Sequence, residues 1–89
     1  MPHVMKYSEI VKAASDGEII YEENRTLGLV RPLKFDGLDF VGVKHGCYLP
    51  LKKCSNDCRD YNLFYRCWNE EPTEKLMNST PWRDSPQEE

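Results

Sequence analysis

The chain has 89 residues, 39% of them hydrophobic and 30% charged, and a formal net charge of −3. This length fits one domain, and the composition is typical of a globular protein rather than a disordered one. The negative charge argues against binding to duplex nucleic acid, which needs a basic face. No apolar run is long enough to span a membrane, and Met1 to Lys6 lack the apolar stretch of a signal peptide, so we expect a cytoplasmic protein without a membrane partner.

The first predicted element is a helix over about residues 8–15. Apolar side chains recur at the helical spacing i, i+3, i+4 and i+7, at Tyr7, Ile10, Val11 and Ala14. Ser8 can cap the first turn, and Gly17 supplies the left-handed residue that commonly ends a helix. This stripe predicts one helix face packed on a core.

Two pairs of strands follow. Residues 18–22 and 26–31 are predicted strands joined by a polar turn at 23–25, with Pro32 closing the second. A hairpin is predicted between 33–35 and 38–43, because Asp36-Gly37 between them tolerates positive φ.

Residues 44–60 show no regular period and predict a long loop that is either functional or held by its own constraint. The aromatic run 61–68 predicts a strand at the centre of the sheet. A short helix is predicted over 72–77, where a proline and acidic residues begin the segment. The expected fold is therefore α+β, a small antiparallel sheet with an N-terminal helix and one short C-terminal helix, forming a single domain over 1–83 with a disordered acidic tail at 84–89.

Two segments, 6–17 and 72–82, resemble a family of small phage proteins, the Thoeris anti-defense proteins of the second type. The first has an aromatic residue, a glutamate and aliphatic residues before Gly17, and the second runs from Pro72 through paired aliphatic residues to Trp82. Of the arginine and tryptophan that the family places after its first strand, only Arg25 has a comparable position. The resemblance implies a homo-oligomer in the host cytoplasm that sequesters a cyclic ADP-ribose-type signalling nucleotide without cleaving it.

Such a site needs aromatic faces for a base and donors for phosphates. The candidate ligand-binding residues are Arg31, Tyr65, Arg66, Trp68, Asn69 and Trp82. The alternative for the tryptophans and Tyr65 is packing in the core or at an interface, where most aromatic residues lie. A small domain with an apolar aromatic strand is also expected to form a homo-oligomer.

Four cysteines gather in the second half of the chain, at Cys47, Cys54, Cys58 and Cys67. The three-residue gap from Cys54 to Cys58 fits a zinc half-site, and His45 could replace one thiol. Structural zinc, unligated thiols and disulfides all remain open. No cofactor is required by the expected function.

The sequence does not predict an enzyme. Cysteine nucleophile chemistry needs a base and an orienting group around a cleft, and the chain has only two histidines, His3 and His45. No phosphate-binding glycine loop or nucleophile elbow is present. The alternative to a nucleotide-sequestering protein is a zinc-stabilised interaction module that inhibits or recruits a host protein.

Overall fold

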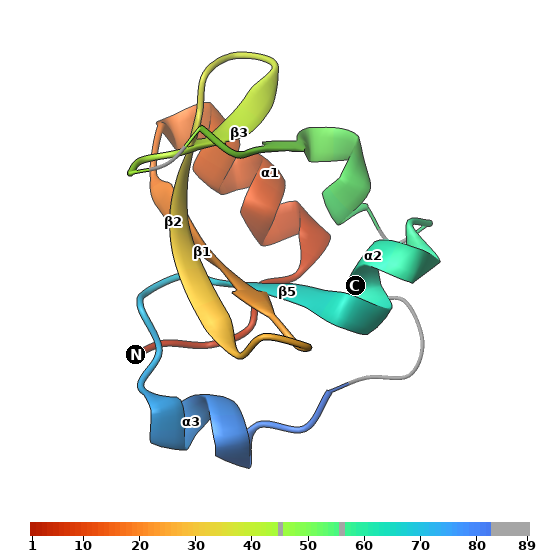
Figure 1. Cartoon of the computed structure of the whole chain (residues 1–89). Helices are drawn as coiled ribbons and strands as arrows, with labels where there is room; N and C mark the ends of the chain where they lie inside the picture. Colours follow the sequence, from red (N-terminus) through yellow and green to blue (C-terminus); the bar gives the residue numbers. More distant parts are fainter. Residues whose placement is uncertain (45, 56, 83–89) are drawn as a thin grey trace.

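The computed structural model describes residues 1–44, 46–55 and 57–82. Its elements in chain order are α1 (Tyr7–Asp16), β1 (Ile19–Asn24), β2 (Leu29–Phe35), β3 (Asp39–Gly42), β4 (Tyr48–Pro50), the 3₁₀ helix η1 (Leu51–Cys54), α2 (Arg59–Phe64), β5 (Tyr65–Trp68) and α3 (Glu74–Ser79). The five strands form one antiparallel sheet in the order β4-β3-β2-β1-β5 (Figure 1). The predicted α+β fold, with an N-terminal helix and a short C-terminal helix, is confirmed. The predicted tail, 84–89, lies outside the described residues.

Helix α1 agrees with its prediction to within one residue at each end. Lys6 holds the N-cap position instead of Ser8, and its N–H donates to Glu9 Oε1 at 3.1 Å. Gly17 ends the helix with φ of 70°, the left-handed conformation that favours glycine. The buried face differs from the predicted stripe, because Ala13 is buried while Val11 is 39% exposed.

Strand β2 continues through Pro32, so the predicted break there is wrong. The Pro32 carbonyl accepts from the N–H of Val43 at 3.0 Å, just beyond the last residue of β3. Since the N and C=O groups of one residue point to the same side of a strand, the missing N–H falls where pairing with β3 ends. A proline is tolerated at such a position.

The β2–β3 hairpin confirms the prediction made from Asp36-Gly37. Phe35 and Phe40 face each other across the two strands, and Gly37 has φ of 109°. Asp36 Oδ1 accepts from the N–H groups of Leu38 and Asp39, both at 2.9 Å. The carboxylate therefore stabilises the turn that the sequence pattern indicates.

The predicted aromatic strand at 61–68 is half helix, because α2 extends to Phe64 and only Tyr65–Trp68 forms β5. The buried Asn62 amide donates to the carbonyls of Ser55 at 3.0 Å and Cys58 at 2.9 Å, which ties the helix to the preceding loop. β5 also lies at the edge of the sheet rather than at its centre. The N-terminal segment covers that edge, with Met5 N–H donating to the Cys67 carbonyl at 2.8 Å.

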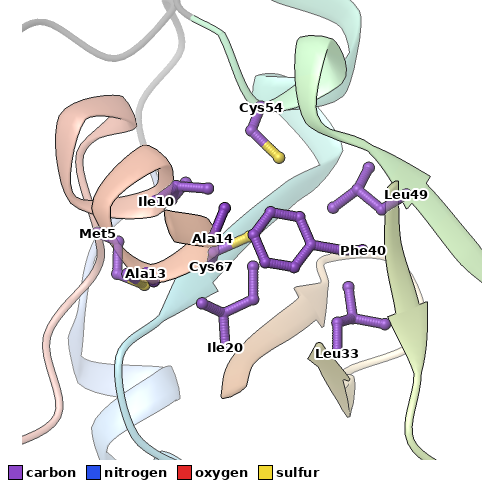
Figure 2. Packing of buried hydrophobic residues seen from close by; sticks show 10 residues of the cluster. All are labelled: Met5, Ile10, Ala13, Ala14, Ile20, Leu33, Phe40, Leu49, Cys54 and Cys67. Carbon is purple, nitrogen blue, oxygen red and sulfur yellow. The ribbon is translucent and has the colours of Figure 1, made fainter. Parts of the chain in front are cut away.

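Side chains alternate between the two faces of the sheet. One face packs against α1 to form the core, which Figure 2 shows as Met5, Ile10, Ala13, Ala14, Ile20, Leu33, Phe40, Leu49, Cys54 and Cys67. Toward the β1–β2 turn, the same face continues with Glu22 and Arg31, and the opposite face carries Glu23 and Arg66. The Glu22–Arg31 and Glu23–Arg66 pairs therefore lie at the same end of the sheet, on opposite faces. No helix in the described part of the chain is both long and apolar enough to cross a membrane.

Candidate functional site

Arg66 is buried on the face of the sheet opposite α1, at 5% exposure. Its Nε donates to Glu23 Oε1 at 2.7 Å, and Trp68 Nε1 donates to the same oxygen at 2.8 Å. Neighbouring strands hold the three residues together, because β1 carries Glu23 and β5 carries both partners. The ion pair satisfies two charges that would be costly to bury separately.

The remaining donors of Arg66 bind the C-terminal segment. Nη1 donates to the carbonyls of Thr80 at 3.0 Å and Pro81 at 3.3 Å, and Nη2 donates to that of Met77 at 3.0 Å. The guanidinium carbon lies 4.1 Å from the Trp82 ring centroid and 5.1 Å from that of Trp68. Arg66 therefore attaches the segment after α3 to the sheet.

Three of the candidate ligand-binding residues, Arg66, Trp68 and Trp82, thus come together in this structural cluster, which we call the C-terminal clasp. A fourth candidate, Asn69, contacts the N-terminal segment. Its Oδ1 accepts from the His3 N–H at 2.7 Å, and its Nδ2 donates to the Met1 carbonyl at 3.3 Å. The hydrogen bonds of Arg66, Trp68 and Asn69 therefore connect segments of the chain itself.

The other two candidates, Arg31 and Tyr65, lie on the opposite face beside a buried carboxylate. Glu22 is 2% exposed, its Oε1 accepts from Nε of Arg31 at 2.6 Å, and the same oxygen lies 2.6 Å from Nη2 of Arg31 in an ion pair. The Tyr61 hydroxyl donates to Oε2 at 2.6 Å. Both oxygens of the buried carboxylate are therefore paired, as a charge in the interior requires.

Arg31 itself is 36% exposed. Its Nη1 has no hydrogen-bond partner among the described residues, so one edge of the guanidinium stays open while Glu22 fixes the other. Burial alone would lower the pKa of Arg31, but the hydrogen bond and the charge of Glu22 outweigh it and raise the pKa. Burial, together with Cys67 and Glu22, raises the pKa of Tyr61. Arg31 is thus a fixed cation and Tyr61 a neutral donor at ordinary pH.

Two hollows of about 720 and 430 Å³ share Glu22, Arg31 and Tyr65 in their walls. We call them together the Arg31 groove. The rings of Tyr61 and Tyr65 stack in the wall of the larger hollow, with centroids 5.0 Å apart and planes at 10°. The other charged residues that line the larger hollow are Lys53, Asp57, Arg59 and Asp60.

The four cysteines are free thiols. Cys54 and Cys67 are 1% exposed and belong to the core, whereas Cys47 and Cys58 are half-buried. A hydrogen bond with Cys67, followed by burial, raises the pKa of Cys54. Among residues 1–44, 46–55 and 57–82, no three His, Cys, Asp or Glu side chains are grouped to hold a metal. His45 lies outside these ranges, and structural zinc stays a prediction.

Sequence reasoning missed Glu22 and Tyr61. The signal for Glu22 was the alternation within β1, where a carboxylate follows buried Ile20 on the same face. A charge at such a position must find a partner, and Arg31 faces it in the predicted neighbouring strand. Tyr61 gave no comparable signal, because it was assigned to a strand.

Comparison with protein-family models, curated proteins and solved structures finds no match to this chain. The candidate site is therefore defined by its geometry. Of the residues that the sequence proposes for a ligand, Arg31 and Tyr65 line an open groove.

Proposed function

We propose that this chain is a binding protein that holds a small phosphate-bearing ligand in the Arg31 groove. The observation that carries the proposal is the state of Arg31, whose guanidinium is fixed on one edge by a buried carboxylate and open on the other. Planar guanidinium groups bind phosphate oxygens through two parallel hydrogen bonds.

Pre-organisation favours this role over a simple surface ion pair. A free arginine side chain loses rotamer entropy when it binds a ligand, but Arg31 is already ordered by Glu22. Glu22 is in turn oriented by Tyr61. Glu22 and Tyr61 together thus fix the orientation of the Arg31 guanidinium before a ligand binds.

The rest of the larger hollow suits a nucleotide. Lys53 and Arg59 add positive charge to the wall, and Asp57 and Asp60 counter it. This balance favours a ligand with few phosphates over a polyanion. The stacked tyrosine rings add aromatic surface, which ligand sites use to bind flat groups.

Taken with the resemblance of 6–17 and 72–82, these features support a phage anti-defence protein that sequesters a cyclic ADP-ribose-type signalling nucleotide. Sequestration needs affinity and no catalyst, so the ligand is released intact. We further propose a homo-oligomer that acts in the cytoplasm of the host cell. A mass in solution equal to one chain at every concentration would contradict the oligomer.

Isothermal titration calorimetry with cyclic ADP-ribose isomers and cyclic dinucleotides tests the proposal. Arg31→Lys keeps the positive charge beside Glu22 but lacks the guanidinium fork, and we expect about tenfold weaker binding. Arg25→Lys is the matched control, because Arg25 lines neither hollow, and its affinity should equal that of the wild type. Chromatography of the recovered ligand should show no cleavage. Absence of heat with every compound would refute the proposal.

A further inference from the structure

The smaller hollow of the Arg31 groove is bordered by apolar side chains on the β1–β2 hairpin. We propose that this hollow is a separate subsite, which takes an uncharged ring of the ligand whose phosphate Arg31 holds. The inference rests on the proposed anion site, and it assigns the ring to Leu27, Leu29 and Tyr65. The tryptophans of the C-terminal clasp then have no part in binding.

The leucines are unusually exposed for their type. Leu27 is 66% and Leu29 63% exposed, and both line the hollow together with Val30 and Tyr65. A single exposed leucine on a protein surface needs no explanation, but neighbouring ones around a concave site indicate contact with something apolar. The volume of about 430 Å³ lies in the range of small-molecule sites.

The turn that carries Leu27 is closed by hydrogen bonds to Asn24. Asn24 Oδ1 accepts from the N–H groups of Thr26 at 2.9 Å and Leu27 at 3.0 Å. The Gly28 N–H donates to the Asn24 carbonyl at 2.8 Å, and Gly28 has φ of 66°. Asn24 therefore holds the rim of the hollow in place before any ligand arrives, which reduces the entropy lost on binding.

The polar groups of the hollow point to a ring with hydrogen-bonding atoms. Asn24 Nδ2 has no partner among the described residues and offers a donor beside the apolar rim. Arg31 belongs to both hollows, so a ring in the smaller one lies next to the anion site. A ligand that joins a flat heterocycle to a phosphate through a short spacer fits this arrangement, as nucleoside phosphates do.

The test compares adenosine 5′-monophosphate with ribose 5-phosphate, which has an anomeric hydroxyl in place of the base. Binding of each is measured by titration of the intact chain and of Leu29→Ser. We expect Leu29→Ser to weaken binding of the nucleotide by about tenfold, as loss of a covered leucine contact implies, and to leave ribose 5-phosphate unchanged. Leu38→Ser is the matched control, because Leu38 is 82% exposed in the β2–β3 turn and lines neither hollow.

The outcomes separate the two proposals. If both phosphates bind and Arg31→Lys weakens both, but Leu29→Ser affects neither, the anion site holds and the ring subsite is wrong. If Leu29→Ser weakens ribose 5-phosphate as much as the nucleotide, the hollow does not discriminate a ring and the inference is also overturned. If neither phosphate binds the wild type, both the anion site and the ring subsite fall.

Discussion

Two adjacent glutamates on β1 point to opposite faces of the sheet, and the arginines paired with them differ in what else they contact. Glu23 and Glu22 are both buried, and each forms an ion pair with an arginine. On one face, Nη1 and Nη2 of Arg66 donate hydrogen bonds to carbonyls of the C-terminal segment. On the other face, Arg31 keeps an open edge in the groove. An arginine paired with a buried carboxylate is therefore structural when backbone carbonyls bind its other N–H groups. It is available to a ligand when those groups face a groove.

The largest effect is expected where the pair is fully covered. Arg66→Met should lower the free energy of unfolding by about 3–5 kcal/mol, because it leaves the Glu23 carboxylate buried without its cation and frees three carbonyls. Urea unfolding followed by tryptophan fluorescence measures this. Arg31→Met also leaves a buried carboxylate, that of Glu22, without its cation, but among the described residues it frees no backbone carbonyl, so we expect a smaller loss. Equal losses for the two variants would abolish the distinction between clasp and groove.

The thiols give the next largest effect. Both Cys54 and Cys58 are free thiols, and Cys54 lies in the core while Cys58 is half-buried. Cys54→Ser should then lower the free energy of unfolding by about 1–3 kcal/mol, because a hydroxyl replaces a buried thiol. Cys58→Ser should lower it by about 0.5 kcal/mol or less. Thermal melting with and without a chelator measures both. A zinc site would instead make wild-type melting sensitive to the chelator, and either exchange would then lose part of a metal-binding energy on the order of 10 kcal/mol and unfold the chain.

Trp82 tests how much the clasp depends on its ring. Its centroid lies 4.1 Å from the Arg66 guanidinium carbon and 5.3 Å from that of Arg25. Trp82→Ala should cost about 1–2 kcal/mol and leave ligand binding in the groove unchanged. Phe64→Ala is a suitable control, because Phe64 is an exposed aromatic residue. Loss of ligand affinity in Trp82→Ala would instead show that Trp82 contributes to the binding site.

The smallest effect concerns an exposed pair, His3 and Glu9, whose Nε2 and Oε2 atoms are 2.6 Å apart. The hydrogen bond from His3, followed by that from the Lys6 backbone, lowers the pKa of Glu9 below 4.5. When folding lowers the pKa of a carboxyl group, that group stabilises the folded state at pH values above its unfolded-state pKa. This stabilisation is lost as the pH falls through the folded-state pKa. Wild type should therefore melt slightly above Glu9→Gln at neutral pH, and the difference should shrink as the pH falls below 4.5 and vanish below the lowered pKa of Glu9. A difference in melting temperature that persists in acid would show that it arises from packing and not from the charge of Glu9.

The sequence by itself determined the local elements. Helix α1, its end at Gly17 and the β2–β3 hairpin depend on contacts between residues a few positions apart. Hydrophobic period and turn chemistry act over that range, so they can be seen in the chain. Arg31 was named as a candidate for a different reason, because the implied nucleotide site needs donors for phosphates.

The tertiary structure decided which partner each charged or aromatic side chain meets. Tyr61 lies 39 positions from Glu22, and Arg66 lies 43 positions from Glu23. Contacts over such separations depend on strand order and on the helical start of the aromatic run, neither of which local propensity specifies. Only the fold could therefore divide the six candidate ligand residues, because burial and pairing, rather than residue type, determine which of them remain open to a ligand.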